Sequence, residues 1–127
     1  MNKINYDNIV RYIIDNFPEF KEYDKEYIDA PYIIIASFGD FLTKRIEAQD
    51  KNDKVVSRAL DLINNLFTDS DTETKLLDLI NIEIFEHFAG SKQAIIFSRS
   101  FLAPKAREYF EKTMIDFGIE SMKLRSR

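Results

Sequence analysis

The stretch from Asp71 to Gly90, DTETKLLDLINIEIFEHFAG, most constrains what this chain can fold into. It predicts one long helix, because Asp71 can cap the N-terminus and Gly90 suits a left-handed stop. At about 100° per residue, one face of this helix is apolar and consists of Leu76, Leu77, Ile80, Ile84 and Phe88. Three more apolar residues lie outside that face, namely Leu79, Ile82 and Phe85. Such a helix belongs in the middle of a bundle, in contact with neighbours on several sides.

A second helix is predicted directly before it, over 54–67, with Asp53 as its cap. Its apolar residues repeat at helical spacing and form one stripe: Val56, Ala59, Leu60, Ile63, Leu66 and Phe67. Only the loop TDSD, 68–71, separates the two helices. Helices joined by so short a loop normally pack antiparallel, so 54–90 is expected to form a helical hairpin.

Three more helices are predicted around this hairpin. The first covers 5–17 and ends before Pro18, which disfavours helical geometry in the residue before it. The second covers 31–49, after a short helical turn and a loop in 19–32. The third covers 104–117, stops at Gly118, and is expected to turn inward Ala106, Tyr109, Phe110, Thr113, Met114 and Phe117. The chain is therefore expected to be all-α, a single-domain bundle of about five to six helices over 1–127.

Three local features leave their structure less determined. Residues 91–101, SKQAIIFSRSF, fit either a short helix or an extended apolar segment. Gly39 lies inside the 31–49 helix, where glycine costs about 1 kcal/mol relative to alanine. We expect it to allow close approach of a neighbouring helix, the alternative being a kink at a functional site. A flexible basic tail is expected from about residue 119, with Lys123, Arg125 and Arg127.

The charge is negative overall but unevenly distributed. The 127 residues carry a net charge of −4, with 10 basic and 18 acidic groups in 1–91 and 8 basic and 4 acidic groups in 92–127. An acidic body repels phosphate backbones and attracts basic partners, which disfavours direct nucleic-acid binding. The sequence contains no cysteine, no apolar N-terminal signal and no run long enough to span a membrane, so a cytoplasmic protein is expected.

No pattern in the sequence indicates catalysis. The only histidine, His87, follows Glu83 by four residues, which would suit a carboxylate orienting an imidazole. No nucleophile or second acid accompanies this pair at a recognisable spacing, so we expect a structural pair at the edge of the core. With glycine only at positions 39, 90 and 118, a glycine-rich phosphate loop is excluded. We predict no enzymatic activity, no metal site and no cofactor.

The segment 19–32, EFKEYDKEYIDAPY, carries the strongest indication of function. Tyrosine offers a large contact area at low entropic cost, and carboxylates around it attract a basic partner. A further acidic set lies at the start and outer face of the 71–90 helix. The predicted partner-binding residues are Tyr23, Asp24, Glu26, Tyr27, Asp29, Asp78 and Glu86. The alternative is that the tyrosines cover the edge of the core and the acids stabilise helix N-termini.

Residues 31–110 resemble a family of small all-helical bacterial domains. The resemblance lies in FGDF at 38–41, the run from LDLINNLF (60–67) through DSDTETKLLDLINIEIFEHF (69–88), and SFLAP at 100–104. Similar small acidic helical proteins are immunity proteins, the antitoxins that accompany secreted or contact-delivered bacterial toxins, as in contact-dependent growth inhibition. This implies a protein that binds a cognate basic toxin, with a nuclease as the expected class, and occludes its active site. The alternative is a small regulatory or phage-type adaptor without a toxin partner.

Overall fold

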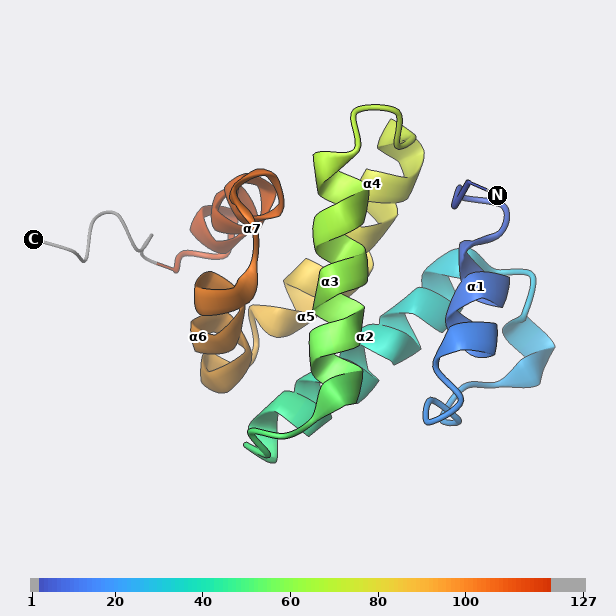
Figure 1. Ribbon diagram of the computed structural model, residues 1–127, viewed down its shortest axis with the longest axis horizontal. Helices are drawn as coiled ribbons and strands as arrows, with labels where there is room; N and C mark the ends of the chain where they lie inside the picture. Colours follow the sequence, from blue (N-terminus) through green and yellow to red (C-terminus); the bar gives the residue numbers. More distant parts are fainter. Residues whose placement is uncertain (1–2, 120–127) are drawn as a thin grey trace, which may run out of the picture.

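The helix predicted to lie at the centre packs against four of the other helices, and the first helix packs on the second (Figure 1). The structure is a computed structural model that describes residues 3–119. In this range it contains helices and no strand, which confirms the all-α prediction. In chain order the elements are α1 (Ile9–Asn16), the 3₁₀ turn η1 (Lys25–Tyr27), α2 (Pro31–Glu47), α3 (Lys54–Thr68), the central helix α4–η2–α5 (Thr74–Ile80, Asn81–Phe85 and Glu86–Phe88), α6 (Lys92–Phe101) and α7 (Pro104–Asp116).

Local sequence signals set most of the helix boundaries as predicted. Pro31 and Pro104 lie in the first turns of α2 and α7, where the missing N–H costs nothing. The carboxylate of Asp53 accepts hydrogen bonds from the N–H groups of Val55 and Val56 at the start of α3. Gly118 has a φ of 77° directly after α7, the left-handed conformation that ends helices. The predicted tail beyond Ile119 lies outside the described residues.

Both predicted ends of the central helix are wrong in detail. The helix begins at Thr74, so Asp71 does not cap it, and the Asp71 N–H donates to the Asp69 side chain at 2.9 Å. Glu73 occupies the cap position, and its carboxylate accepts a hydrogen bond from the N–H of Tyr6 at 2.7 Å. Gly90 does not adopt a left-handed conformation. The Glu73 side chain therefore binds the distant N-terminal segment and does not cap its own helix.

The central helix is also not α-helical throughout. Residues Asn81–Phe85 form a π-helical turn, η2, in which the N–H of Glu86 donates to the carbonyl of Asn81. This turn lies against α2 at Gly39, where an added Cβ would be 2.6 Å from the carbonyl oxygen of Glu83. The expectation that Gly39 permits close approach of a neighbouring helix is confirmed.

The apolar core includes residues from every α-helix. In the central helix all the predicted apolar residues are at least half-buried except Ile82, which is 49% exposed. α3 and α4 run in opposite directions across the loop that joins them, as the predicted hairpin requires (Figure 1). η2 and α5 then pack mainly on α2.

The C-terminal third shows which of the two structures expected for residues 91–101 is present, and it corrects the orientation predicted in the last helix. Residues 92–101 form a helix, α6, with Ser91 accepting a hydrogen bond from the N–H of Ala94 at 3.2 Å. In the last segment Phe117 is 52% exposed, so its predicted inward orientation is wrong. Tyr109 is 39% exposed, but its ring lies 4.9 Å from the ring of buried Phe67, measured between centroids. Phe117 follows the last residue of α7, where the helical periodicity no longer applies. α6 and α7 are joined by a two-pronged ion pair between buried Arg99 and Glu111, at 2.9 and 3.0 Å.

Candidate functional site

The segment 19–32, called the tyrosine segment below, is anchored to the core through Phe20. This side chain is 2% exposed, and its ring lies 5.2 Å from Phe38 and 5.3 Å from Phe41, measured between ring centroids. Tyr23 packs on Phe20 at 5.1 Å and is half-buried. Tyr23 therefore covers the edge of the core, the alternative considered for it above. Anchoring by Phe20 holds the residues that follow it on the rigid body of the protein.

The rest of the segment lies at the surface. Asp24 accepts a hydrogen bond from the N–H of Glu26 at 2.9 Å and so caps the turn η1. Glu26 and Asp29 are exposed. Asp29 also lines a small pocket of about 320 Å³ between α1 and the turn, together with Asp7 and Asp15. A basic side chain, Arg11, lines the same pocket.

Apolar side chains close to these carboxylates in sequence are exposed as well. Tyr27, Ile28 and Tyr32 are 43%, 41% and 56% exposed. We call the exposed group Glu26, Tyr27, Ile28, Asp29 and Tyr32 the tyrosine surface. Ile28 and Tyr32 are not among the partner-binding residues predicted from the sequence. Periodicity contains the signal for Tyr32, because at about 100° per residue it lies off the face formed by the buried Ile34, Ile35 and Phe38.

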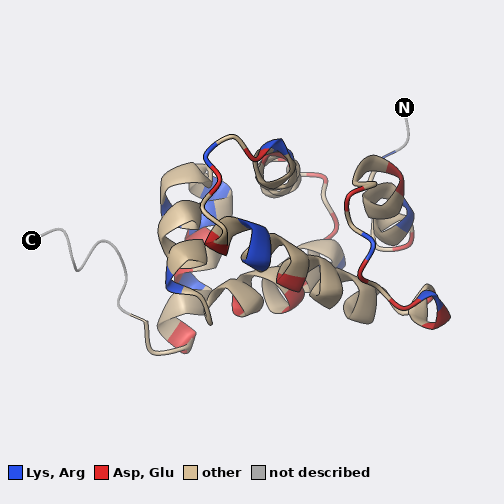
Figure 2. Ribbon diagram, turned by 90° about the horizontal axis from the view of Figure 1, so that it is seen from below, with Lys and Arg blue, Asp and Glu red and all other residues tan. Residues whose placement is uncertain are grey.

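The two remaining predicted residues lie elsewhere on the molecule. Asp78 is exposed on α4 and Glu86 is half-buried on α5, whereas the tyrosine segment lies beyond α1 at one end of the molecule (Figure 1). Figure 2 shows acidic residues on several helices and loops rather than in one patch. The structure thus groups Tyr27, Asp29 and their neighbours, but does not join them with Asp78 and Glu86.

His87, considered above with Glu83 as a catalytic pair, has an acidic neighbour from another helix. Asp40 on α2 lies 3.7 Å from Nε2 of His87, and the same carboxylate forms an ion pair with Lys44 at 3.0 Å. Burial and the neighbouring Glu86 carboxylate raise the pKa of Glu83, an effect that His87 partly offsets. Sequence reasoning did not identify Asp40 as the neighbour of His87, because the contact depends on how α2 packs on the central helix.

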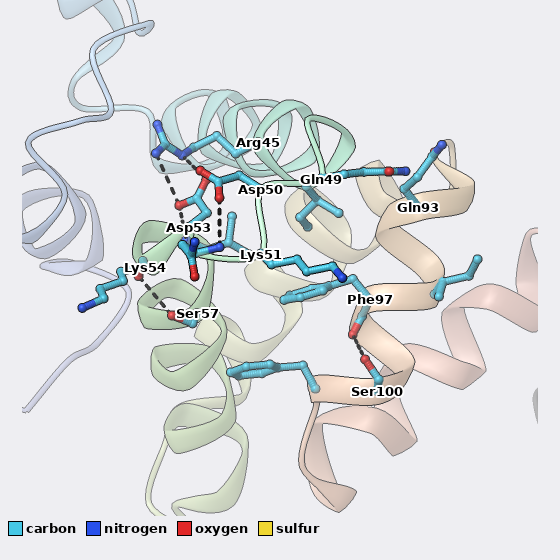
Figure 3. Close-up of a pocket in the computed structure, with 15 residues that line it drawn as sticks. Arg45, Gln49, Asp50, Lys51, Asp53, Lys54, Ser57, Gln93, Phe97 and Ser100 are labelled. Carbon is cyan, nitrogen blue, oxygen red and sulfur yellow. Dashed lines mark hydrogen bonds and ion pairs between the residues drawn. The ribbon is translucent and has the colours of Figure 1, made fainter.

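A pocket of about 620 Å³ lies between α2, the loop 48–53, α3 and α6 (Figure 3). Arg45 and Asp53 form an ion pair at 2.9 Å at one edge of this pocket. Burial raises the pKa of Asp53, but the hydrogen bond from Arg45 and those from the N–H groups of Val56 and Val55 outweigh it, so the pKa is lowered overall. No sequence pattern indicated this pocket.

Residues 3–119 contain neither a metal-binding cluster nor a helix suited to cross a membrane. No cluster of three or more histidine, aspartate or glutamate side chains is placed to hold a metal ion in this range. None of its helices combines the length and apolar character needed to cross a membrane.

The family comparison covers most of the chain. A family described as Domain of unknown function (DUF7674) matches residues 10–117. This range begins within α1 and ends just after α7, so the match includes the whole helical bundle. No curated protein and no solved structure was found to match the chain.

Proposed function

The chain belongs to the DUF7674 family, whose function is not defined, and we propose from its own surface that it is a protein-binding domain that captures a basic partner. More specifically, we propose an immunity protein that acts in the cytoplasm and neutralises a bacterial toxin, with a nuclease as the preferred class. It would act by occlusion, without making or breaking bonds.

The observation that carries this proposal is the tyrosine surface. Tyr27, Ile28 and Tyr32 expose apolar area beside the carboxylates of Glu26 and Asp29. Aromatic and branched side chains provide affinity when a partner covers them, whereas carboxylates around them favour partners of positive charge. Because Phe20 is buried, the surface loses little conformational entropy on binding.

The charge of the whole chain supports the same class of partner. A net charge of −4 attracts a basic protein over about one Debye length, roughly 8–10 Å at physiological salt. A nuclease must present basic side chains to hold phosphates, so carboxylates can occupy the same positions and block the site. The pocket beside Asp29, with Asp7 and Asp15, suits an arginine or lysine side chain of such a partner.

The test is co-purification from the native host, followed by binding measurements on the captured protein. We expect Tyr27→Ala and Asp29→Lys each to weaken binding by tenfold or more, about 1.4 kcal/mol. The control is Asp61→Lys, the same charge change at an exposed position on α3. Binding should also weaken as salt rises.

The outcomes separate the parts of the proposal. If neither variant at the tyrosine surface affects binding more than Asp61→Lys does, this surface is not the interface. Affinity that is independent of salt would remove the electrostatic contribution. A captured partner without toxic activity, and without a toxin gene beside that of this chain, would favour the adaptor function instead.

A further inference from the structure

The 620 Å³ pocket arises from the way α6 and α3 are held apart. α6 packs on α2 and α5, and α3 packs on α7, so neither helix has the other as its main neighbour. The loop that joins α2 to α3 closes one end of the resulting space (Figure 3). The volume lies within the range of about 300–1,000 Å³ that is typical of small-molecule sites.

The walls of the pocket are mainly apolar. Val56 on α3 faces a wall from α6 that includes Ile96, Phe97 and Phe101. The Phe97 and Phe101 rings are stacked, with centroids 5.5 Å apart and an angle of 19° between their planes. Ile96 is 59% exposed, so its side chain is available to a ligand. An apolar wall with two aligned rings suits the aliphatic or aromatic part of a small ligand.

The rim is polar and has an unbalanced positive charge. Three basic and two acidic side chains line the pocket: Arg45, Lys51, Lys54, Asp50 and Asp53. The positive charge of Arg45 is balanced by the carboxylate of Asp53, with which it forms an ion pair. Lys51 forms no ion pair with any residue in 3–119, and Figure 3 shows its side chain extending from the loop across the pocket toward α6.

The backbone at the rim provides a second observation. Gln49 follows the end of α2 with a φ of 58°, and it is the sole residue other than glycine with a positive φ among the described residues. Glycine is favoured at such a position, and another side chain there is strained. The Gln49 side chain lines the pocket, with Gln93 beside it on α6 (Figure 3). Gln49 thus ends α2 in the left-handed conformation common after helices and places its amide at the pocket rim.

We propose that this pocket binds a small apolar molecule that carries one carboxylate. The body of the ligand would lie on Val56, Phe97 and Ile96, and its carboxylate would accept a hydrogen bond from the Lys51 ammonium at the rim. The amide groups of Gln49 and Gln93 provide further donors beside it. This binding does not depend on the proposed function, because the pocket and the tyrosine surface involve different residues.

The experiment uses decanoate as the probe, below its micelle concentration, with decan-1-ol and decyltrimethylammonium as neutral and cationic counterparts. Titrations followed by ¹⁵N–¹H NMR should move the amide signals of Lys51 and Phe97 and the side-chain NH₂ signals of Gln49 and Gln93. We expect decanoate to bind about tenfold more tightly than decyltrimethylammonium.

Two pairs of variants separate charge from apolar contact. Lys51→Glu should weaken decanoate binding by about tenfold and leave decan-1-ol nearly unchanged, whereas Lys112→Glu, the same charge change on α7, should affect neither. Ile96→Ser should weaken both probes severalfold. Its control is Ile115→Ser, at an isoleucine on α7 that is 56% exposed and does not line the pocket.

Three results would overturn the proposal: no binding of decanoate at millimolar concentration, signal changes centred outside the pocket, or equal losses in the pocket variants and their controls. Preference for decan-1-ol or for the cation would exclude a carboxylate ligand. If no probe binds but the captured protein partner moves these same signals, the pocket accommodates a partner side chain and the small-molecule inference is wrong.

Discussion

Replacing Gly39 with alanine tests whether the close approach of α2 to the central helix is required. The added Cβ would lie 2.6 Å from the carbonyl oxygen of Glu83 and 3.3 Å from Cα of Ile84. Both of these atoms belong to the backbone, so a change of side-chain rotamer cannot relieve the contact. An ordinary contact distance is at least 3.4 Å, so the two helices must separate by about 0.8 Å at this point.

The cost of that separation should exceed the benefit of alanine in a helix. Alanine is favoured over glycine by about 1 kcal/mol in a helix interior. Separation loosens the contacts between α2 and the central helix, and a gap of 0.5–1 Å forfeits about a quarter to a half of each dispersion contact. Overpacking of this kind typically costs about 1–3 kcal/mol. Because the clash is with backbone atoms, we expect a cost in the upper part of this range, about 2–3 kcal/mol. Subtracting the benefit of alanine leaves a net loss of about 1–2 kcal/mol in the free energy of unfolding.

Urea unfolding followed by circular dichroism measures this loss. In thermal unfolding the same change corresponds to a decrease in Tm of roughly 4–8 °C for a domain of this size. Gly90→Ala is the matched control, because its Cβ would meet only the carbonyl oxygen of His87, at an ordinary 3.6 Å, and its φ is not left-handed. The control should be neutral or slightly stabilised. A Gly39→Ala variant as stable as the unmodified protein would refute the reasoning.

Three further predictions concern charged groups. Asp53→Ala should lose about 1–2 kcal/mol at pH 7, through the cap and the Arg45 pair. The pKa of Asp53 is lowered in the folded protein, so the Asp53 carboxylate stabilises the fold above its unfolded pKa and loses this effect as pH falls through its folded pKa. The free energies of unfolding of the variant and the unmodified protein should therefore become similar in acid. The pKa of Glu83 is raised, so its ionisation opposes folding. The Glu83→Gln variant should therefore be more stable than the unmodified protein at pH 7, and this difference should disappear below about pH 4. Urea unfolding at several pH values measures it. Glu111→Gln should cost about 1–3 kcal/mol by leaving buried Arg99 without its two-pronged carboxylate, and the double variant Arg99→Met/Glu111→Leu should recover part of that loss.

The parts of the fold that could be predicted are those that neighbouring residues decide. Proline in a first turn, Asp53 before an apolar stripe and Gly118 after one act within a single turn of the chain. The start of the central helix was not predicted correctly: Glu73 occupies the cap position without capping the helix, and its side chain binds the N–H of Tyr6, 67 residues away. The π-helical turn is equally non-local, since α2 lies against it at Gly39.

The same distinction, between what neighbouring residues determine and what distant contacts determine, applies to the candidate sites. Tyrosines and acids in one short segment are visible in the sequence, and Tyr27 and Asp29 are exposed as a binding surface requires. Tyr23 is half-buried because its ring packs on the ring of buried Phe20. No pattern in 19–32 distinguishes Tyr23 from Tyr27. The pocket depends on the space between α3 and α6, which are distant in sequence, so composition and periodicity contain no signal for it.

The π-helical turn has a consequence for changes in chain length. Its hydrogen bond from Glu86 to Asn81 encloses one residue more than an α-helical bond would. Deleting one residue from an ordinary helix rotates everything after it by about 100°. Here, the loss of exposed Ile82 would instead leave a regular helix with both halves still directed at the core. The middle of the molecule is thus the place where a chain one codon shorter should still fold.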